Sequence, residues 1–249
     1  MIRSIKEWKK DGEIILKKYK TLLFDVDDTL LDFGAAEKEA LRLLLEEQNF
    51  PLTNEVVSRY KNINQGLWTA FEEGKLNLDG VLNSRFSILF KEYGLEVDGS
   101  LLEKQYRRLL AESHQLIPGA LELISNLQNH FDLYIVTNGV SETQYKRLRD
   151  SGLSPFFKDI FVSEETGFQK PMQGFFDYVF ARIPDFALED CLIIGDSLSS
   201  DMKGGQLAGI TTCWFNSKLK PNHSEIIPSY QIQKLDELYE ILNLTAVHS

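Results

Sequence analysis

Short apolar stretches alternate with amphipathic stretches over most of the chain. The apolar ones are four or five residues long and rich in Val, Ile and aromatic residues, which is typical of parallel strands covered on both faces. Helical spacing predicts helices over Ala120–Asn129 and Ser141–Ser151, the second with Ser141 and Gln144 in capping-box spacing. This alternation predicts an α/β fold, a Rossmann-like parallel sheet with right-handed crossovers. The predicted strands are Thr21–Phe24, Leu133–Thr137, Asp159–Val162, Cys191–Gly195 and Thr211–Phe215.

One interval between predicted strands is too long for a single crossover. About 110 residues separate Asp25 from Thr137, whereas one βαβ unit takes about 30 residues. The excess residues carry only helical patterns. These patterns are an apolar face made by Val56, Tyr60, Ile63, Leu67 and Phe71, and further helices over Leu78–Glu92 and Leu101–His114.

We therefore predict an all-helical cap domain inserted into the α/β core. The cap would span residues 33–115, and the core would comprise residues 19–32 and 116–249. The hinges would lie near Leu31–Gly34 and Gln115–Gly119, the latter marked by a Pro-Gly pair. The alternative is an ordinary helical excursion that gates nothing.

The segment before the first predicted strand is an N-terminal extension, residues 1–18. Ile5, Trp8 and Ile15 lie among many lysines there, which predicts a short amphipathic helix. This end of the chain lacks the apolar region of a signal peptide, and no apolar run is long enough to span a membrane. We expect a cytoplasmic protein without a membrane partner.

Composition and charge narrow the classes of partner. The 249 residues include 27 Lys and Arg against 37 Asp and Glu, a net charge of -10. Such an acidic balance argues against binding nucleic acid, but one local positive field is enough to bind a small phosphorylated molecule. The two cysteines, Cys191 and Cys213, lie inside predicted strands and are expected to be buried apolar residues. We expect a monomer or a weak homo-oligomer.

Polar residues follow four of the predicted strands, at the carboxyl ends where open parallel sheets bind ligands. Asp25 and Asp27 are two residues apart, so extended backbone would point both to the same side. Neighbouring carboxylates repel each other and favour a divalent cation or a shared proton. Their oxygens suit Mg²⁺. The full set is Asp25, Asp27, Thr137, Asn138, Lys170, Asp196 and Asp201.

Each of these residues also has a simpler interpretation. A single aspartate can be a solvated loop residue or a helix cap, and this reading is strong for Asp28 and Asp32. Lys170 alone could be a surface lysine before a turn proline, and Thr137 a strand-end hydroxyl. Among the aromatic residues of the insertion, most are expected in its core, and Trp68 is our choice if one faces the site.

Four segments resemble the motifs of the haloacid-dehalogenase-like hydrolase superfamily. Asp25-Val26-Asp27-Asp28-Thr29 resembles its D-x-D-x-T signature, and Thr137 ends an apolar strand as its second motif does. Lys170 resembles the third-motif lysine, and the segment from Gly195 to Asp201 resembles G-D-x-x-x-x-D. The resemblance covers about residues 20–235, and the helical insertion is similar to the first cap type of the family.

This resemblance implies a site and a mechanism. Asp25 would attack phosphorus and form an aspartyl-phosphate, and Asp27 would act as general acid and then as general base. Lys170 would supply positive charge to the nucleophile and the phosphoryl group. The remaining roles are Mg²⁺ binding by Asp25, the main-chain carbonyl of Asp27 and Asp196, with Asp201 nearby, and phosphoryl binding by Thr137 and the Asn138 backbone.

Several functions stay open. An aspartate at position 27 favours phosphoryl transfer over dehalogenation, because a halide leaving group needs no proton. Two segments resemble those of a branch of the superfamily that contains pyrimidine 5′-nucleotidases: Asp-Asp-Thr-Leu-Leu-Asp-Phe and Gly-Phe-Gln-Lys-Pro. This resemblance implies a phosphomonoesterase for nucleoside 5′-monophosphates. The alternatives are a sugar-phosphate phosphatase, a phosphomutase, a phospho-accepting signalling module without turnover, and a silent metal-binding relative.

Overall fold

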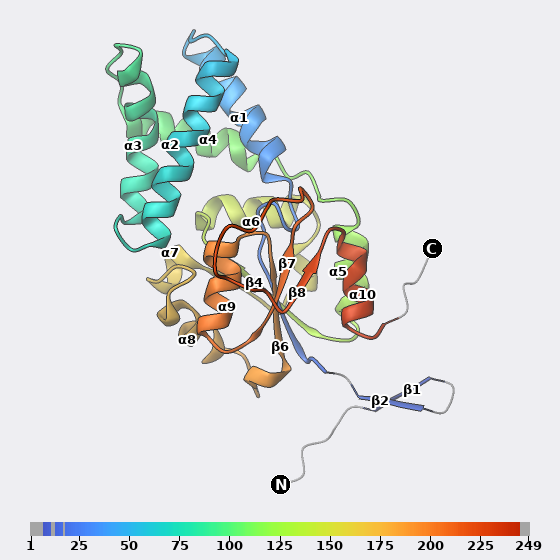
Figure 1. Cartoon of the computed structure of the whole chain (residues 1–249). Helices are drawn as coiled ribbons and strands as arrows, with labels where there is room; N and C mark the ends of the chain where they lie inside the picture. The colour runs from blue at the N-terminus through green and yellow to red at the C-terminus, as the bar shows by residue number, and fades with distance from the viewer. Residues whose placement is uncertain (1–6, 11–12, 17, 245–249) are drawn as a thin grey trace.

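A six-stranded parallel sheet forms the centre of the molecule (Figure 1). The structure is a computed structural model that describes residues 7–10, 13–16 and 18–244. The α/β fold and the five predicted strands are confirmed, and a short edge strand is added. The strands lie in the order β5-β4-β3-β6-β7-β8. They are β3 (Thr21–Phe24), β4 (Asp132–Thr137), β5 (Asp159–Val162), β6 (Cys191–Gly195), β7 (Thr211–Phe215) and β8 (Tyr230–Ile232).

Helices cover both faces of this sheet because successive strand residues point to opposite faces. Leu22 and Phe24 pack in one apolar cluster with residues of α5 (Ala120–Leu127), α6 (Ser141–Asp150) and α10 (Leu238–Ile241). Leu23 packs in another cluster with α8 (Gln173–Phe180). This double cover explains why β3 and β6 are buried at every residue and carry no polar alternation. The short helices α7 (Ser163–Thr166) and α9 (Lys203–Leu207) complete the core.

The long interval between β3 and β4 forms four helices with their own apolar cluster. Tyr60 and Phe86 stack in it with ring centroids 5.6 Å apart. Each helix begins after a residue whose side chain accepts a hydrogen bond from the backbone N–H three residues later. Asp32 is such a residue, which confirms that it caps the N-terminus of a helix. Figure 1 shows the helices grouped together beside the sheet. They are α1 (Phe33–Glu47), α2 (Asn54–Glu72), α3 (Leu78–Glu92) and α4 (Gly99–Ala111).

The two connections between these helices and the sheet run side by side. The Asp32 N–H donates to the Gln115 carbonyl at 2.8 Å, and the Ile117 N–H donates to the Leu30 carbonyl at 2.9 Å. Two more contacts join the far end of α2 to the core. Gln169 Nε2 donates to the Phe71 carbonyl at 2.5 Å, and the Ser199 hydroxyl donates to Glu72 at 2.7 Å.

The predicted N-terminal helix is wrong for the residues that the structure describes. There, β1 (Glu7–Lys10) and β2 (Glu13–Leu16) pair antiparallel, with Trp8 opposite Ile15. An Asp-Gly pair separates the two strands in the sequence, and such a pair favours a hairpin over a helix. Ile5, which the helix prediction also used, lies outside the described residues.

Candidate active site

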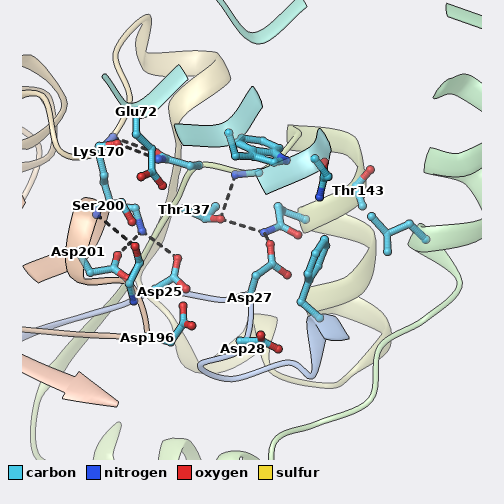
Figure 2. A pocket seen from close by; sticks show the side chains of 18 of the residues that line it. Asp25, Asp27, Asp28, Glu72, Thr137, Thr143, Lys170, Asp196, Ser200 and Asp201 are labelled. Atoms are coloured by element: carbon cyan, nitrogen blue, oxygen red, sulfur yellow. Dashed lines mark hydrogen bonds and ion pairs between the residues drawn. The ribbon is translucent and has the colours of Figure 1, made fainter. Parts of the chain in front are cut away.

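A cavity of about 270 Å³ lies at the carboxyl end of the sheet, between the core and helices α2 to α4 (Figure 2). Its wall includes every site residue predicted from the sequence, although these residues come from four separate segments. Parallel strands bring these segments together because their carboxyl ends share one edge of the sheet. The predicted set that meets here is Asp25, Asp27, Thr137, Asn138, Lys170, Asp196 and Asp201.

Lys170 stands at the centre of one half of the cavity wall. Its side chain is only 1% exposed, and its ammonium group donates to Asp25 at 2.8 Å, to Asp201 at 2.6 Å and to the Val136 carbonyl at 2.7 Å. The three donors of the ammonium group therefore all have partners. A surface lysine is excluded, because the side chain reaches inward to the end of β4.

Asp201 reaches this position because Gly195 lacks a side chain. A Cβ atom at Gly195 would lie 2.2 Å from an oxygen of Asp201. The Ser197 N–H donates to the other side of the same carboxylate at 3.1 Å. The spacing of the Gly-Asp segment thus places one aspartate at the end of β6 and returns another to it one turn later.

The carboxylates of this half are crowded in a poorly solvated place. Burial raises the pKa of Asp25 to about 7, against the opposing effect of the Lys170 charge. Burial likewise raises the pKa of Asp196 to about 6, and it raises the pKa of Asp201. For Lys170 burial acts in the lowering direction, but the charges of Asp201 and Asp25 leave the pKa above its ordinary value. The pocket thus needs more positive charge than Lys170 supplies.

A divalent cation fits that need. One carboxylate oxygen from each of Asp25, Asp196 and Asp201 lies within 4.8 Å of the other two. All three residues line the cavity, and hard carboxylate oxygens are the ligand type that Mg²⁺ takes. Both oxygens of Asp201 already accept hydrogen bonds, from Lys170 and Ser197. Within the described part of the chain, the Asp196 carboxylate accepts one hydrogen bond, from Lys220 at 3.1 Å. The donor set therefore fits Mg²⁺. Asp196 is the freest of the three ligands, because both oxygens of Asp25 also accept hydrogen bonds, from Lys170 and from the Thr29 hydroxyl at 3.2 Å.

Asp27 lies in the other half of the wall, apart from this group (Figure 2). Its carboxylate accepts hydrogen bonds from two residues of α6, Arg147 at 2.5 Å and Gln144 at 2.9 Å. The Gln144 amide also donates to the Thr137 hydroxyl at 2.9 Å. The side chain of Asp27 is thus separated from the candidate cation ligands and is 29% exposed to the cavity.

Thr137 and Asn138 have different local roles. The Thr137 hydroxyl accepts from the Gly139 N–H at 3.2 Å, which leaves its own hydrogen free for a ligand. The side chain of Asn138 instead forms two hydrogen bonds of 2.9 Å with the backbone of Lys170, one in each direction. This pair fixes the segment after β4 to the segment that carries the lysine.

Sequence reasoning missed the two α6 residues. The capping box predicted from Ser141 and Gln144 is wrong, because the cap position is Val140, whose side chain makes no capping hydrogen bond, and the Ser141 N–H donates to Glu164 at 2.8 Å. The Gln144 side chain turns into the cavity instead. Gln144 and Arg147 are three residues apart, so they share one helix face, and this shared face was the available signal.

Helices α2 to α4 supply the opposite wall. Tyr60 and Phe71 are buried, as expected for core residues, whereas Trp68, our choice if one aromatic residue faced the site, borders the cavity. Arg85 is buried and donates to Glu103 through two nitrogens, at 2.6 and 2.8 Å. Arg107 also borders the cavity and donates to Glu103 through Nε at 2.7 Å. Nothing in the strand-end pattern pointed to these residues, because they are far from it in the chain.

Within residues 18–244 and the two N-terminal strands, no helix combines the length and the apolar character needed to cross a bilayer.

Comparison with known proteins agrees with this geometry. A family model described as haloacid dehalogenase-like hydrolase matches residues 19–209. The HAD-hydrolase YfnB of Bacillus subtilis (strain 168) is 70% identical over 229 residues, which cover 92% of this chain and 97% of YfnB. The crystal structure of the orthorhombic form of YfnB, bound to magnesium and described as revealing interdomain movement, has a TM-score of 0.88 and 71% identity and covers 92% of this chain and all of that one.

A second relative has a more specific name. The pyrimidine 5′-nucleotidase PynA of Streptococcus pneumoniae (strain ATCC BAA-255 / R6) is 40% identical over 226 residues, which cover 90% of this chain and 95% of PynA. The extent of the family match and the identity to both relatives decide the question of family. This chain belongs to the haloacid dehalogenase-like hydrolase family and is a hydrolytic enzyme.

Proposed function

We propose that this enzyme is a magnesium-dependent phosphomonoester hydrolase that acts on small phosphorylated metabolites through an aspartyl-phosphate. The observation that carries the proposal is the arrangement of Asp25, Lys170 and Asp196 on one side of the cavity, with Asp27 held on the other. A nucleophile and an acid–base group thus flank a place where a phosphoryl group would lie.

In the first half-reaction, an oxygen of Asp25 forms a bond to phosphorus. The bond from phosphorus to the leaving oxygen breaks, and this oxygen takes a proton from Asp27. Lys170 favours the ionised, nucleophilic form of Asp25, because its charge lowers the pKa of that carboxyl. The Thr137 hydroxyl would donate to a phosphoryl oxygen.

In the second half-reaction, a water molecule gives a proton to Asp27 as its oxygen attacks phosphorus. The bond between phosphorus and Asp25 breaks, and inorganic phosphate leaves. The residues that would hold Mg²⁺ are Asp25, Asp196 and the main-chain carbonyl of Asp27, with Asp201 beside them. The ion would supply positive charge that neutralises the nucleophile and the phosphoryl oxygens.

We further propose that residues 33–115 are a cap over a core of residues 19–32 and 116–249. Three features support this division: a separate apolar cluster, two adjacent connections, and a cavity between the parts. The contacts of α2 with Gln169 and Ser199 hold the cap to the loop that carries Lys170 and to the helical turn Leu198–Met202 that carries Asp201.

We propose nucleoside 5′-monophosphates as the preferred substrates. The name of PynA supports this choice, and so does the character of the cap wall. Trp68 and Arg107 both line the cavity. An aromatic ring and a hydrogen-bond donor are suited to a planar base that carries acceptor atoms.

A phosphate-release panel tests the proposal. The enzyme is assayed with and without Mg²⁺ on pyrimidine and purine nucleoside 5′-monophosphates and on sugar phosphates, with Asp25→Asn as the inactive control. We expect magnesium-dependent release that is fastest with nucleotides. Equal rates across the panel would overturn the nucleotide preference, and the absence of release from every compound would overturn the phosphatase proposal.

A further inference from the structure

Arg147 connects the acid–base candidate to both connections of the cap. The residue lies on α6 and is 1% exposed. Its Nη1 donates to Asp27 at 2.5 Å, and its Nε donates to the Ser113 carbonyl at 2.9 Å. Its guanidinium carbon lies 5.8 Å from the centroid of the Phe33 ring. Ser113 follows α4 and Phe33 begins α1, so one side chain contacts both ends of the inserted helices.

Gln144 is the second residue that donates a hydrogen bond to Asp27, and it also contacts Arg147. Its Oε1 accepts from Arg147 at 3.0 Å, and its Nε2 donates to the second oxygen of Asp27. The backbone leaves room for it only because residue 139 is glycine, since a Cβ there would lie 2.6 Å from three atoms of the Gln144 side chain. Both oxygens of Asp27 therefore have a fixed donor, and both donors are buried.

We propose that Arg147 is a positioning residue that aims Asp27 at the leaving oxygen and makes this aim depend on the position of the cap. The inference rests on the proposed role of Asp27 in phosphoryl transfer. Besides the Gln144 amide, Arg147 contacts a carboxylate, a backbone carbonyl and an aromatic face. A shift of either cap connection removes at least one of these contacts, so the Asp27 orientation seen here belongs to one cap arrangement.

A purely structural role for Arg147 predicts a different behaviour. Loss of a buried arginine that only supports Ser113 would weaken catalysis on every substrate by the same factor. Loss of an aiming contact would weaken most the substrates whose leaving oxygen needs a proton. An alkyl leaving group needs that proton, whereas a nitrophenolate leaves without it.

The test compares kcat/KM of Arg147→Met and of the unsubstituted enzyme on a nucleoside 5′-monophosphate and on p-nitrophenyl phosphate, with Mg²⁺. This ratio reports the steps up to departure of the leaving group, before water attacks. We expect the nucleotide value to fall about 100-fold, the low end of the usual general-acid contribution, and the aryl value to fall at least about tenfold less. Equal losses, or no loss, would overturn the inference.

Two further variants keep the test decisive. Arg149→Met removes an arginine of the same helix whose side chain is 68% exposed and far from these contacts, and it should leave both values unchanged. If Arg147→Met does not fold, Gln144→Leu removes the other donor to Asp27 and should show the same selective loss. Equal losses in that variant would likewise overturn the inference. Failure of the unsubstituted enzyme to release phosphate from either compound would instead overturn the proposed function.

Discussion

Asn138 and Lys170 are joined by two reciprocal hydrogen bonds of 2.9 Å between the asparagine side chain and the lysine backbone. The lysine side chain then turns back under the end of β4 to reach Asp25. Asn138, which is expected to bind phosphate, thus also positions the Lys170 ammonium group beside the candidate nucleophile Asp25.

Asn138→Leu should therefore lower both stability and activity. It leaves a backbone donor and a backbone acceptor without partners, which costs about 1–3 kcal/mol each when buried. We expect the free energy of unfolding in urea to fall by at least about 2 kcal/mol and kcat to fall as Lys170 shifts. Asn129→Leu, at an exposed asparagine of the core, is the control and should change neither quantity. Equal effects of the two substitutions would contradict the assigned role of Asn138.

Magnesium should stabilise the protein more strongly at high pH than at low pH. The pKa of Asp25 is raised from 3.8 to about 7 by burial, and that of Asp196 to about 6. Between the ordinary pKa of 3.8 and these raised values, the folded chain keeps protons that the unfolded chain loses. The free energy of unfolding without metal therefore falls as the pH rises through this range. A cation that binds the ionised carboxylates removes this loss.

Melting temperatures with and without Mg²⁺ measure this effect. We expect a small shift on adding Mg²⁺ at about pH 5 and a large one at about pH 8. Asp196→Asn should reduce the shift at the higher pH. The same shift at both pH values would show that these carboxylates do not form the cation site.

Glu103 should be among the most important residues for the stability of the cap. It is buried between Arg85 and Arg107 and accepts from both. Removal of one partner from a buried ion pair typically costs about 3–5 kcal/mol, because a charge is left without compensation. We expect that loss for Glu103→Ala in urea unfolding. The matched control is Glu92→Ala, which breaks the exposed pair with Arg59 and should cost below about 1 kcal/mol. A cost for Glu103→Ala as small as that of the control would contradict the account.

Trp68 should contribute to nucleotide binding and not to the chemical step. Stacking of a base on an aromatic ring is worth about 1–3 kcal/mol, so Trp68→Ala should raise KM for nucleoside 5′-monophosphates about 5- to 150-fold. Trp68→Phe should keep most of the affinity. Glycerol phosphate, which has no ring, serves as the internal control. An equal rise in KM for glycerol phosphate would mean that Trp68 shapes the cavity without contacting a base.

Prediction from sequence worked best where local pattern and burial agree. β3 and β6 are buried at every residue, and their apolar composition reveals this directly. β8 was missed because it has three residues and only Ile232 is buried. The N-terminal pair was missed because a helical face was counted where the strand residues and an Asp-Gly pair favoured a hairpin.

Only the part of the site that lies at the ends of the strands could be predicted from the sequence. Asp25 and Asp196 directly follow apolar strands and Thr137 ends one, and the topology of a parallel sheet brings such residues together. Gln144 and Arg147 lie on a polar helix, where the sequence cannot separate a solvated side chain from one that turns to a carboxylate. Glu103 depends on how α3 and α4 pack, and helical spacing alone does not determine that packing.

The most direct test of the central claim is to trap the phosphoryl group on Asp25. The enzyme is mixed with Mg²⁺ and a nucleoside 5′-monophosphate carrying ³²P, quenched in acid within one turnover, and digested to locate the label. We expect protein-bound label on the peptide that contains Asp25, and neither label nor turnover in Asp25→Asn, with an unchanged melting profile. Turnover by Asp25→Asn at the original rate, with no label on the protein, would contradict the account.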